Sequence, residues 1–226
     1  MRHERQGEYR DVPVGHRGRH GSENRLGLNR AFDRRGRECN RQVNMKKIIS
    51  LFQRNYDGDR LVRNEVVPGA EWVLAGEGIA TRKWDGTCCL IRDGKLYKRY
   101  EVKPGGKAPA NFEPANEVDE NTGKQQGWVP VGDGPEDRWH REAFDGAHWS
   151  DGTYELCGPK VQGNPDGLIG HLLIAHGQHP IDGDPRDFDG IREYLAAHDI
   201  EGIVWHHPDG RMAKIKGKDF GIKRKP

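Results

Sequence analysis

The feature that most constrains the fold of this chain is a pair of Asp-Gly turns, each lying between two short segments with many apolar residues. Asp-Gly favours the tight turn that joins antiparallel strands, because both positions readily adopt a positive φ. Asp93-Gly94 and Asp209-Gly210 therefore predict two β-hairpins. The expected strands are residues 87–90 with 96–102, and residues 201–206 with 211–216.

Other short apolar segments extend this pattern. Residues 153–157 predict a strand, and residues 103–150 predict a long excursion with short strands, because Gly, Pro, Asn and Asp crowd that stretch. The remaining short apolar runs are residues 72–75, 128–131 and 168–175. Many short strands with little helix indicate an α+β fold built on antiparallel sheet.

One segment is a good candidate for a helix, residues 188–198. Ile191, Tyr194 and Leu195 recur there at helical spacing, and Asp187 or Asp189 lies near its start. An apolar stripe of this period with an acidic residue at the N-terminus is typical of an amphipathic helix.

Composition excludes several classes of protein. The chain has 226 residues, of which 33% are hydrophobic, and it lacks the run of about 20 apolar residues that a membrane span needs. Four cysteines are too few for a disulfide scaffold, and we expect no secretory signal. The net charge is only +2, so any contact with nucleic acid must come from a local patch. We expect a soluble, cytoplasmic, monomeric protein with one large domain.

The first 44 residues differ from the rest in charge and in hydrophobicity. They contain eleven Arg, no Lys and six acidic residues, and they have few large apolar side chains. Such a segment cannot bury enough surface to fold, so we expect it to be disordered. It is either an Arg-rich arm that contacts phosphates or a non-native extension upstream of a start at Met45. Residues 45–226 are then the folded domain.

The chemistry of the chain begins at Lys83-Trp84-Asp85-Gly86. A lysine is a nucleophile only as the neutral amine, which is about one part in a thousand at pH 7 for a free side chain. Burial or nearby cations must lower its pKa. Lys214 and Lys216 are alternate residues of an expected strand, so both point to one face and could supply that charge. Alone, the four-residue pattern is more typical of a charged turn than of a catalytic lysine.

Three further motifs follow in order: Thr153-Tyr154-Glu155-Leu156-Cys157-Gly158, then Glu201-Gly202-Ile203-Val204, then Lys214-Ile215-Lys216. This ordered set resembles the covalent nucleotidyltransferases, which are the ATP-dependent DNA and RNA ligases and the capping enzymes. Within them the chain most resembles the 5′-phosphate, 3′-hydroxyl RNA ligases of the vertebrate RNA ligase 1 type. The likeness spans roughly residues 81–221 and includes Gly127-Trp128-Val129-Pro130-Val131, His171-Leu172-Leu173-Ile174 and Gly163-Asn164-Pro165.

The resemblance implies an antiparallel-sheet ligase adenylation domain, and the end of the chain ten residues after Lys216 leads us to expect no appended OB-fold. It also implies a reaction in three steps. A lysine takes AMP from ATP, the AMP passes to a 5′-phosphate end of RNA, and a 3′-hydroxyl then displaces it and seals the strand. The expected co-substrates are therefore ATP and RNA, with Mg²⁺ or Mn²⁺ as the metal.

Residue roles follow from the same resemblance. Lys83 is the nucleophile and Asp85 supports it. Glu155 holds the ribose of the nucleotide, and Glu201 binds the divalent metal. Lys214 and Lys216 hold the α-phosphate. These residue types suit the roles, because carboxylates bind hard cations and ribose hydroxyls, while ammonium groups stabilise phosphoryl oxygens.

A basic residue near the nucleotide or the RNA end is also implied. Arg99 occupies that position, with Lys103 as a possible assistant. For the adenine pocket the nearest candidates are Thr81, Arg82 and His176.

Several alternatives remain open at this point. The chain could be a DNA ligase, a capping-type enzyme, or an RNA-binding module that is not catalytic. Trp128 and Trp205 are either core residues or platforms for stacked bases, and Cys88-Cys89 is expected to be buried strand. The chain has no Cys-x-x-Cys pair, so its sequence predicts no zinc site. The basic cluster near the end of the chain, at residues 216–218 and 223–225, either contacts phosphates or is a solvated tail.

Overall fold

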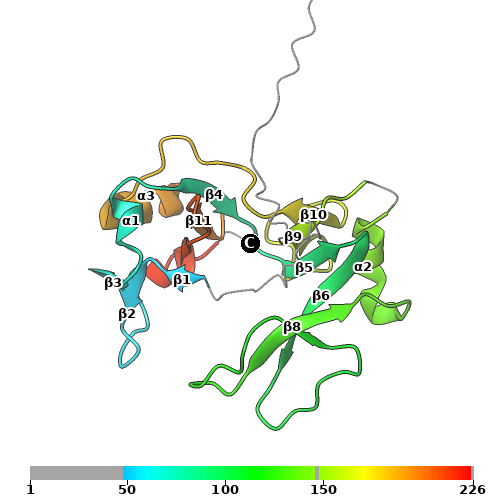
Figure 1. Cartoon of the computed structure of the whole chain (residues 1–226). Coiled ribbons are helices and arrows are strands. Elements are labelled where there is room, and N and C mark those ends of the chain that lie inside the picture. The colour runs from blue at the N-terminus through cyan, green and yellow to red at the C-terminus, as the bar shows by residue number, and fades with distance from the viewer. Residues whose placement is uncertain (1–47, 146–147, 225–226) are drawn as a thin grey trace, which may run out of the picture. The chain divides into compact units, whose positions relative to one another are not determined.

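Both predicted hairpins are present in the computed structural model, which describes residues 48–145 and 148–224 (Figure 1). Strand β5 (Thr87–Arg92) pairs with β6 (Lys95–Val102), and φ is 51° at Asp93 and 67° at Gly94. Positive φ at both turn positions matches the natural twist of a hairpin. Strand β11 (Gly202–His206) pairs antiparallel with β12 (Met212–Lys216) across the turn that contains Gly210.

The β5–β6 hairpin lies at the centre of a six-stranded antiparallel sheet with the order β10-β9-β5-β6-β8-β7. Its other strands are β7 (Glu113–Pro114), β8 (Gln125–Pro130), β9 (Gly152–Cys157) and β10 (Leu172–Ala175). Strand β9 confirms the prediction for residues 153–157, and β7 and β8 are the short strands expected in the long excursion.

The β11–β12 hairpin belongs to a second sheet of four strands, ordered β1-β12-β11-β4. The outer strands are β1 (Ile49–Ser50) and β4 (Ile79–Lys83). Strand β1 runs parallel to β12, which is the one departure of the named strands from the expected antiparallel pairing. A two-stranded sheet, β2 (Phe52–Arg54) with β3 (Val62–Val66), completes the described strands.

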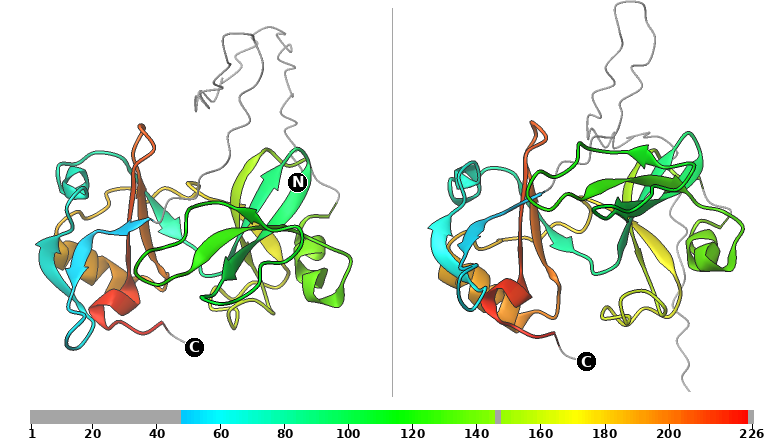
Figure 2. Two further views of the ribbon diagram at one scale, coloured as in Figure 1. Left: turned by 60° about the horizontal axis from the view of Figure 1, so that its bottom comes forward. Right: turned by 90° about the horizontal axis from the view of Figure 1, so that it is seen from below.

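One face of the four-stranded sheet is covered by helix α3 (Phe188–Ala197) and forms the larger core (Figure 2). Ile203 and Ile215 of the sheet and Ile191 of the helix are fully buried together. The predicted helix is thus confirmed, and it begins where Asp187 accepts a hydrogen bond from the Gly190 N–H at 2.9 Å. A short helix, α1 (Glu71–Leu74), contributes to the same core.

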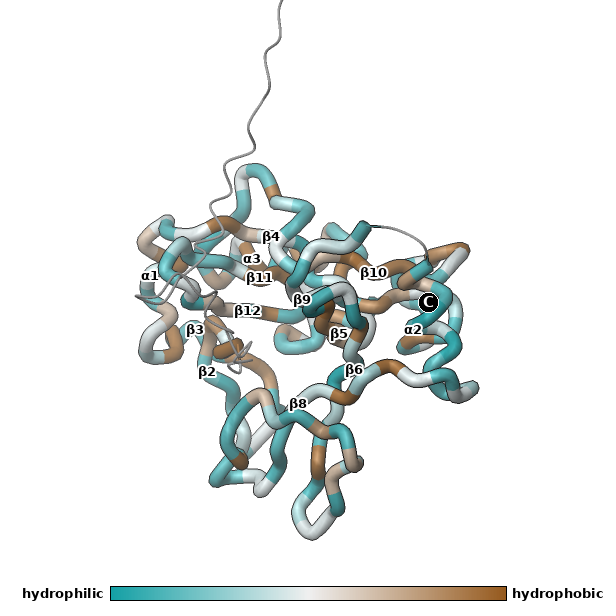
Figure 3. Tube along the Cα trace, turned by 45° about the vertical axis from the view of Figure 1, so that its right-hand side comes forward, coloured by the Kyte–Doolittle hydropathy of each residue, from teal (hydrophilic) through white to brown (hydrophobic). Residues whose placement is uncertain are grey.

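The six-stranded sheet carries its own apolar clusters. Trp128 of β8 is 2% exposed and Trp205 of β11 is fully buried, so both are core residues and neither offers a face for stacking bases. Cys89 is fully buried as expected, whereas Cys88 is only partly covered. Figure 3 shows apolar segments on the central strands and hydrophilic loops beyond them.

The long excursion also contains helical turns that the sequence pattern did not predict. They are η1 (Pro135–Asp137) and α2 (Arg138–Ala143), and a third short turn, η2 (Gly217–Phe220), follows β12. The α2 segment is too polar and short to show an apolar period. Asp137, the residue just before α2, makes no capping hydrogen bond to the helix; its side chain instead accepts hydrogen bonds from Lys98 Nζ at 2.5 Å and the Gly132 N–H at 2.8 Å.

All described residues belong to the unit Gln42–Pro226. The Arg-rich first 44 residues, the expected start at Met45 and Lys225 lie outside the described residues. Among the residues that are described, no helix is both long and apolar enough to cross a membrane.

Candidate active site

The connection Trp84-Asp85-Gly86 carries the chain from β4 of the four-stranded sheet directly into β5 of the six-stranded sheet. Gly86 lies so close to β9 that a Cβ at this position would come within 2.1 Å of the Leu156 carbonyl oxygen. Its N–H donates to Glu155 Oε1 at 3.1 Å. The glycine therefore permits a close backbone approach, which joins the lysine motif to the glutamate motif 69 residues later.

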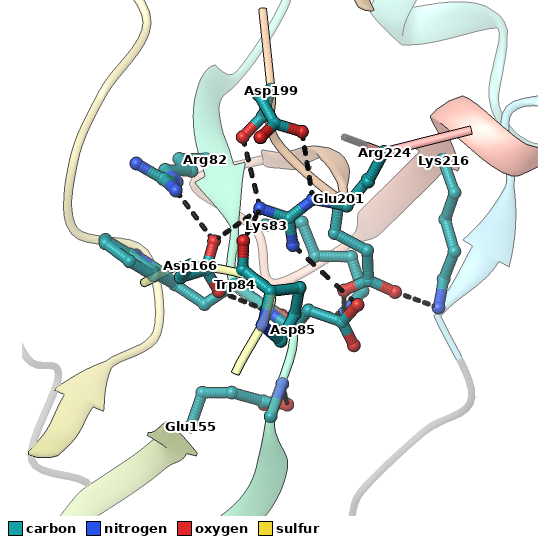
Figure 4. A network of polar contacts seen from close by, with 12 residues as sticks. Arg82, Lys83, Trp84, Asp85, Glu155, Asp166, Asp199, Glu201, Lys216 and Arg224 are labelled. Atoms are coloured by element: carbon teal, nitrogen blue, oxygen red, sulfur yellow. Dashed lines mark hydrogen bonds and ion pairs between the residues drawn. The ribbon is translucent and has the colours of Figure 1, made fainter. Parts of the chain in front are cut away.

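Lys83 is the last residue of β4 and lies opposite Gly202 of β11. Lys216 of β12 lies opposite the same glycine on its other side. Glu201 immediately precedes this row, and its two carboxylate oxygens bind the two lysines (Figure 4): Lys83 Nζ lies 2.5 Å from Oε2, and Lys216 Nζ contacts Oε1. The register of three strands thus gathers residues from three of the sequence motifs.

The charge state of Lys83 differs from the expectation. Burial acts to lower its pKa, but the carboxylates of Glu201, Glu155 and Asp85 act in the opposite direction, and the pKa lies above its ordinary value. In the ligand-free protein Lys83 is therefore an ammonium group. The prediction that the pKa of Lys83 is lowered was wrong for the ligand-free protein, because the charged group that contacts Lys83 is the Glu201 carboxylate and not another cation.

Lys214 carries the lowered pKa instead. It lies two residues before Lys216 on β12, so the side chains share a face of the sheet, as predicted. Burial, followed by the charges of Lys216 and Lys83, lowers its pKa to about 8. The charge of Arg99 on β6 acts in the same direction. Positive charges from both sheets therefore contribute to the lowered pKa of Lys214.

Glu155 and Arg99 lie on one row of the six-stranded sheet. Glu155 of β9 is opposite Cys88 of β5, and the pairing of Cys89 with Lys98 places Cys88 opposite Arg99 of β6. Glu155 is 8% exposed, whereas Arg99 is exposed to solvent. Lys103, proposed as an assistant, is exposed in the turn after β6.

Of the adenine-pocket candidates, Thr81 shares the Lys83 face of β4, and its buried hydroxyl donates to the Val204 carbonyl at 3.2 Å. Arg82 points to the opposite face, where its guanidinium covers the Trp84 ring at 3.9 Å. His176 hydrogen-bonds Glu155 Oε2 at 2.9 Å.

A buried acid, Asp166, was missed by the sequence reasoning. Its side chain is 2% exposed, and its Oδ1 lies 2.8 Å from both Arg82 Nη2 and Arg224 Nη2. Its other oxygen accepts a hydrogen bond from the Asp85 N–H at 3.3 Å. Asp166 thus holds the connection after Lys83, and Figure 4 shows it beside Trp84 and Asp85. It lies beside the string Gly163-Asn164-Pro165, which marked the segment without indicating a role.

Arg224 is committed to the same network. It also pairs with Asp199 at 3.4 Å and approaches Asp85 at 3.8 Å, and its side chain is 17% exposed. Arg224 is therefore engaged in ion pairs within the protein and is less available for the phosphate contacts predicted for the basic end of the chain.

Comparison with known proteins supports the resemblance to RNA ligases that the sequence motifs indicated. A sequence model of the family described as RNA ligase 1 matches residues 146–225. RNA ligase 1 of Mus musculus is 26% identical, and that of Rattus norvegicus is 27% identical; each match covers 64% of this chain and 67% of the relative. RNA ligase 1 of Danio rerio is 26% identical over the same shares. The resemblance to RNA ligase 1 is confirmed.

The segment matched by the RNA ligase 1 family contains Glu155, Glu201, Lys214 and Lys216. Asp166 also lies inside it. Lys83 lies outside this segment, so its position in the site rests on the strand register and on its contact with Glu201.

Proposed function

We propose that this protein is an ATP-dependent RNA ligase that joins 5′-phosphate and 3′-hydroxyl ends through a lysyl-AMP intermediate on Lys83. The similarity to RNA ligase 1 proteins supports the reaction class. The observation that carries the proposal is the contact of Lys83 Nζ with Glu201 Oε2 at 2.5 Å, between residues 118 positions apart in the chain.

The first step of the proposed reaction is the transfer of AMP from ATP to the amine of Lys83. Lys83 attacks the α-phosphorus of ATP, the bond to pyrophosphate breaks, and AMP remains on the lysine nitrogen. The attacking amine must first lose a proton. While Glu201 stays paired with Lys83 that proton is held, so nucleotide binding has to separate the two charges. Burial and the positive charges of Lys214 and Lys216 then favour the neutral amine.

The carboxylate groups around Lys83 fit a hard divalent cation. Glu201 has two oxygens in a half-enclosed position, where its side chain is 10% exposed, and Asp85 lies close enough for the charge of Glu201 to act on it. Both are oxygen ligands of the kind that Mg²⁺ prefers. When bound, Mg²⁺ would neutralise charge on the triphosphate and on Glu201. We assign its binding to Glu201, with Asp85 as a neighbouring acid.

The second and third steps need no further nucleophile from the protein. The 5′-phosphate of RNA attacks the lysyl-AMP and releases Lys83, and a 3′-hydroxyl then displaces AMP. AMP is a better leaving group than the oxygen of a phosphate monoester, which is why the adenylated end can be sealed. Arg99 is exposed and its charge acts on Lys214, so it is the residue we expect to contact the RNA end or the nucleotide.

The test is adenylation followed by sealing. ATP labelled at the α-phosphate should leave an acid-stable label on the protein, which Lys83→Ala abolishes and Glu201→Ala greatly reduces. Lys95→Ala, an exposed lysine of the neighbouring hairpin, is the matched control. Nicked RNA and nicked DNA, with ATP and then GTP, separate an RNA ligase from a DNA ligase or a capping-type enzyme. Label that survives Lys83→Ala contradicts the assignment, and the absence of any label favours a non-catalytic RNA-binding module.

A further inference from the structure

Three side chains of types that can bind transition metals, Cys88, Glu155 and His176, lie close together on one face of the six-stranded sheet. The Cys88 sulfur, a Glu155 carboxylate oxygen and a His176 ring nitrogen all lie within 4.8 Å of one another. They come from three consecutive positions of the sheet, β5, β9 and the residue that follows β10. The sequence gives no hint of the cluster, because 67 residues separate Cys88 from Glu155 and the spacing resembles no zinc motif.

The strand register explains why the three side chains converge. Cys88 and Glu155 are directly opposite each other, and Glu155 is also opposite Ile174 of β10. His176 is two residues beyond Ile174 and its N–H donates to the Thr153 carbonyl at 3.1 Å, so it continues the strand on the same face. Directly opposed and diagonal neighbours on one sheet face are within side-chain reach of each other.

The three donor atoms lie close together, and two of them already contact each other. Glu155 Oε1 is held by the Gly86 N–H, which leaves Oε2 directed at His176 Nε2 at 2.9 Å. The Cys88 thiol makes only a long 3.9 Å contact to the Cys89 carbonyl. In tetrahedral zinc sites the ligand atoms lie about 3.5 Å apart, so small side-chain rotations would bring the three donors to bonding distance.

We propose that Cys88, Glu155 and His176 form a binding site for a Zn²⁺-class divalent cation, with a fourth position open to solvent. A thiolate with an imidazole selects zinc over magnesium, which prefers oxygen ligands alone. Binding replaces the thiol proton of Cys88 and the hydrogen bond between His176 and Glu155. The protein supplies three ligands, as in catalytic zinc sites, and the fourth ligand is a water molecule or another molecule from solution.

The site has a consequence for nucleotide binding, and this part rests on the function proposed above. Glu155 is the residue expected to hold the ribose of ATP, so a cation on its Oε2 competes with the nucleotide. Zinc should therefore inhibit adenylation in the presence of excess magnesium. The two cations would occupy different positions, zinc on the six-stranded sheet at Glu155 and magnesium on the four-stranded sheet at Glu201.

Cobalt is the probe for the site itself, in the absence of ATP. Co²⁺ added to the full chain should bind one per molecule and give a thiolate-to-cobalt charge-transfer band in the near ultraviolet, and Zn²⁺ should displace it. The band should disappear in Cys88→Ser, and His176→Gln should weaken Co²⁺ binding at least tenfold. His176 is exposed, so its variant tests the proposal even if Cys88→Ser folds poorly.

Two other cysteines are the matched controls. Cys39→Ser removes the thiol of the Arg-rich segment, and Cys157→Ala removes a buried thiol of β9. Both should keep the band. A band that survives Cys88→Ser, or Co²⁺ bound with only the weak spectrum of oxygen ligands, overturns the site.

Inhibition is measured separately, as the ratio of adenylation with and without micromolar Zn²⁺ at fixed Mg²⁺ within each variant. We expect at least tenfold inhibition of the unchanged chain and little in Cys88→Ser. Cobalt binding without zinc inhibition would leave the metal site standing and overturn the competition with the nucleotide. Cobalt binding in a protein that takes no label from ATP would separate the metal site from the proposed ligase function.

Discussion

Lys83 and Glu201 form an ion pair across two neighbouring strands, with 2.5 Å between Nζ and Oε2, and a second lysine, Lys216, occupies the other carboxylate oxygen. The acid therefore separates two ammonium groups that would otherwise repel each other. This arrangement holds Lys83, the proposed nucleophile, in its charged form in the ligand-free protein. It also means that Glu201 controls the reactivity of Lys83 before any ligand arrives.

Replacing that acid by its neutral isostere should release the lysine. In Glu201→Gln the charge that most raises the pKa of Lys83 is gone, while burial still lowers that pKa and only the charges of Glu155 and Asp85 still raise it, so the pKa should fall. The rate at which an amine-selective acylating reagent modifies Lys83, followed by mass spectrometry across pH 6–10, should rise at pH 7–8. Glu142→Gln, on the far helix α2, is the control. An unchanged or higher midpoint for Lys83 contradicts the role of Glu201.

Lys214 should make nucleotide binding depend on pH in the mildly alkaline range. Its pKa is about 8, so it is mostly charged at pH 7 and mostly neutral at pH 9. Loss of this charge should weaken binding of a triphosphate that cannot transfer AMP, such as the α,β-methylene analogue of ATP, by roughly tenfold between pH 7 and pH 9. In Lys214→Arg the guanidinium stays charged, so that pH dependence should largely vanish in calorimetric titrations. If binding of the ATP analogue depends on pH equally in the unchanged protein and in Lys214→Arg, Lys214 is not the group that causes this pH dependence.

The same residue should affect stability with the opposite sign. The folded protein holds Lys214 at a lower pKa than the unfolded chain does, so between pH 8 and the ordinary lysine value the unfolded state binds more protons. The free energy of unfolding therefore gains a contribution that rises with pH across this window. At pH 7 the charge is a burden, and Lys214→Met should raise the thermal midpoint while it weakens nucleotide binding. Lys218→Met, on an exposed lysine of η2, should change neither. A lower midpoint for Lys214→Met would show that the charge stabilises the fold.

Asp166 should be as important for stability as for the position of Lys83. It is the shared partner of Arg82 and Arg224, and its side chain is almost fully buried. Asp166→Asn therefore leaves Arg82 without its charged acceptor and leaves Arg224 with only the longer contacts to Asp199 and Asp85. We expect a loss of ~3 kcal/mol in the free energy of unfolding, measured with urea, together with slower adenylation. Asp199→Asn removes an exposed partner of the same Arg224 and should cost less than ~1 kcal/mol. Similar losses for the two variants would rule out a special role for the buried acid.

Gly202 should tolerate no side chain. A Cβ there would lie 2.1 Å from the Ile215 carbonyl oxygen on β12, so Gly202→Ala has to push β11 and β12 apart. We expect it to lower the free energy of unfolding by ~2 kcal/mol or more and to reduce labelling by ATP, because the strands that carry Lys83 and Lys216 both pair with Gly202. Gly170→Ala, where no atom lies within 4 Å of the added carbon, is the control. Normal stability in Gly202→Ala would mean that the two strands can adjust.

Local signals in the sequence predicted the hairpins and the helix well. Asp93-Gly94 fixes its turn through two positive φ angles, and Asp187 caps α3 by its own side chain, so each depends on residues within a few positions. Strand β4 was not predicted, because its five residues end in Arg82-Lys83 and show no clear apolar alternation. Helix α2 was missed for a related reason, since its six residues are mostly polar and show no apolar period.

The members of the site were predicted by motif order, but their electrostatics were not. The alternation of Lys214 and Lys216 correctly placed both on one face. The raised pKa of Lys83 depends on a carboxylate 118 residues away, and the role of Asp166 depends on arginines 84 and 58 residues away. Such distances are set by the pairing of strands and by the path of the final segment, neither of which a local pattern contains.

The three-residue connection after Lys83 also limits which changes of length the chain can accept. Because Trp84, Asp85 and Gly86 bridge two sheets with almost no slack, one inserted residue would shift either the lysine out of its row with Gly202 or β5 out of its row with Glu155. Each such slip turns side chains to the other face of a strand. The solvent-exposed turn at residues 103–108 does not connect the two sheets. We therefore expect insertions and deletions to be tolerated in that turn, whereas a change of length at residues 84–86 should disrupt the site.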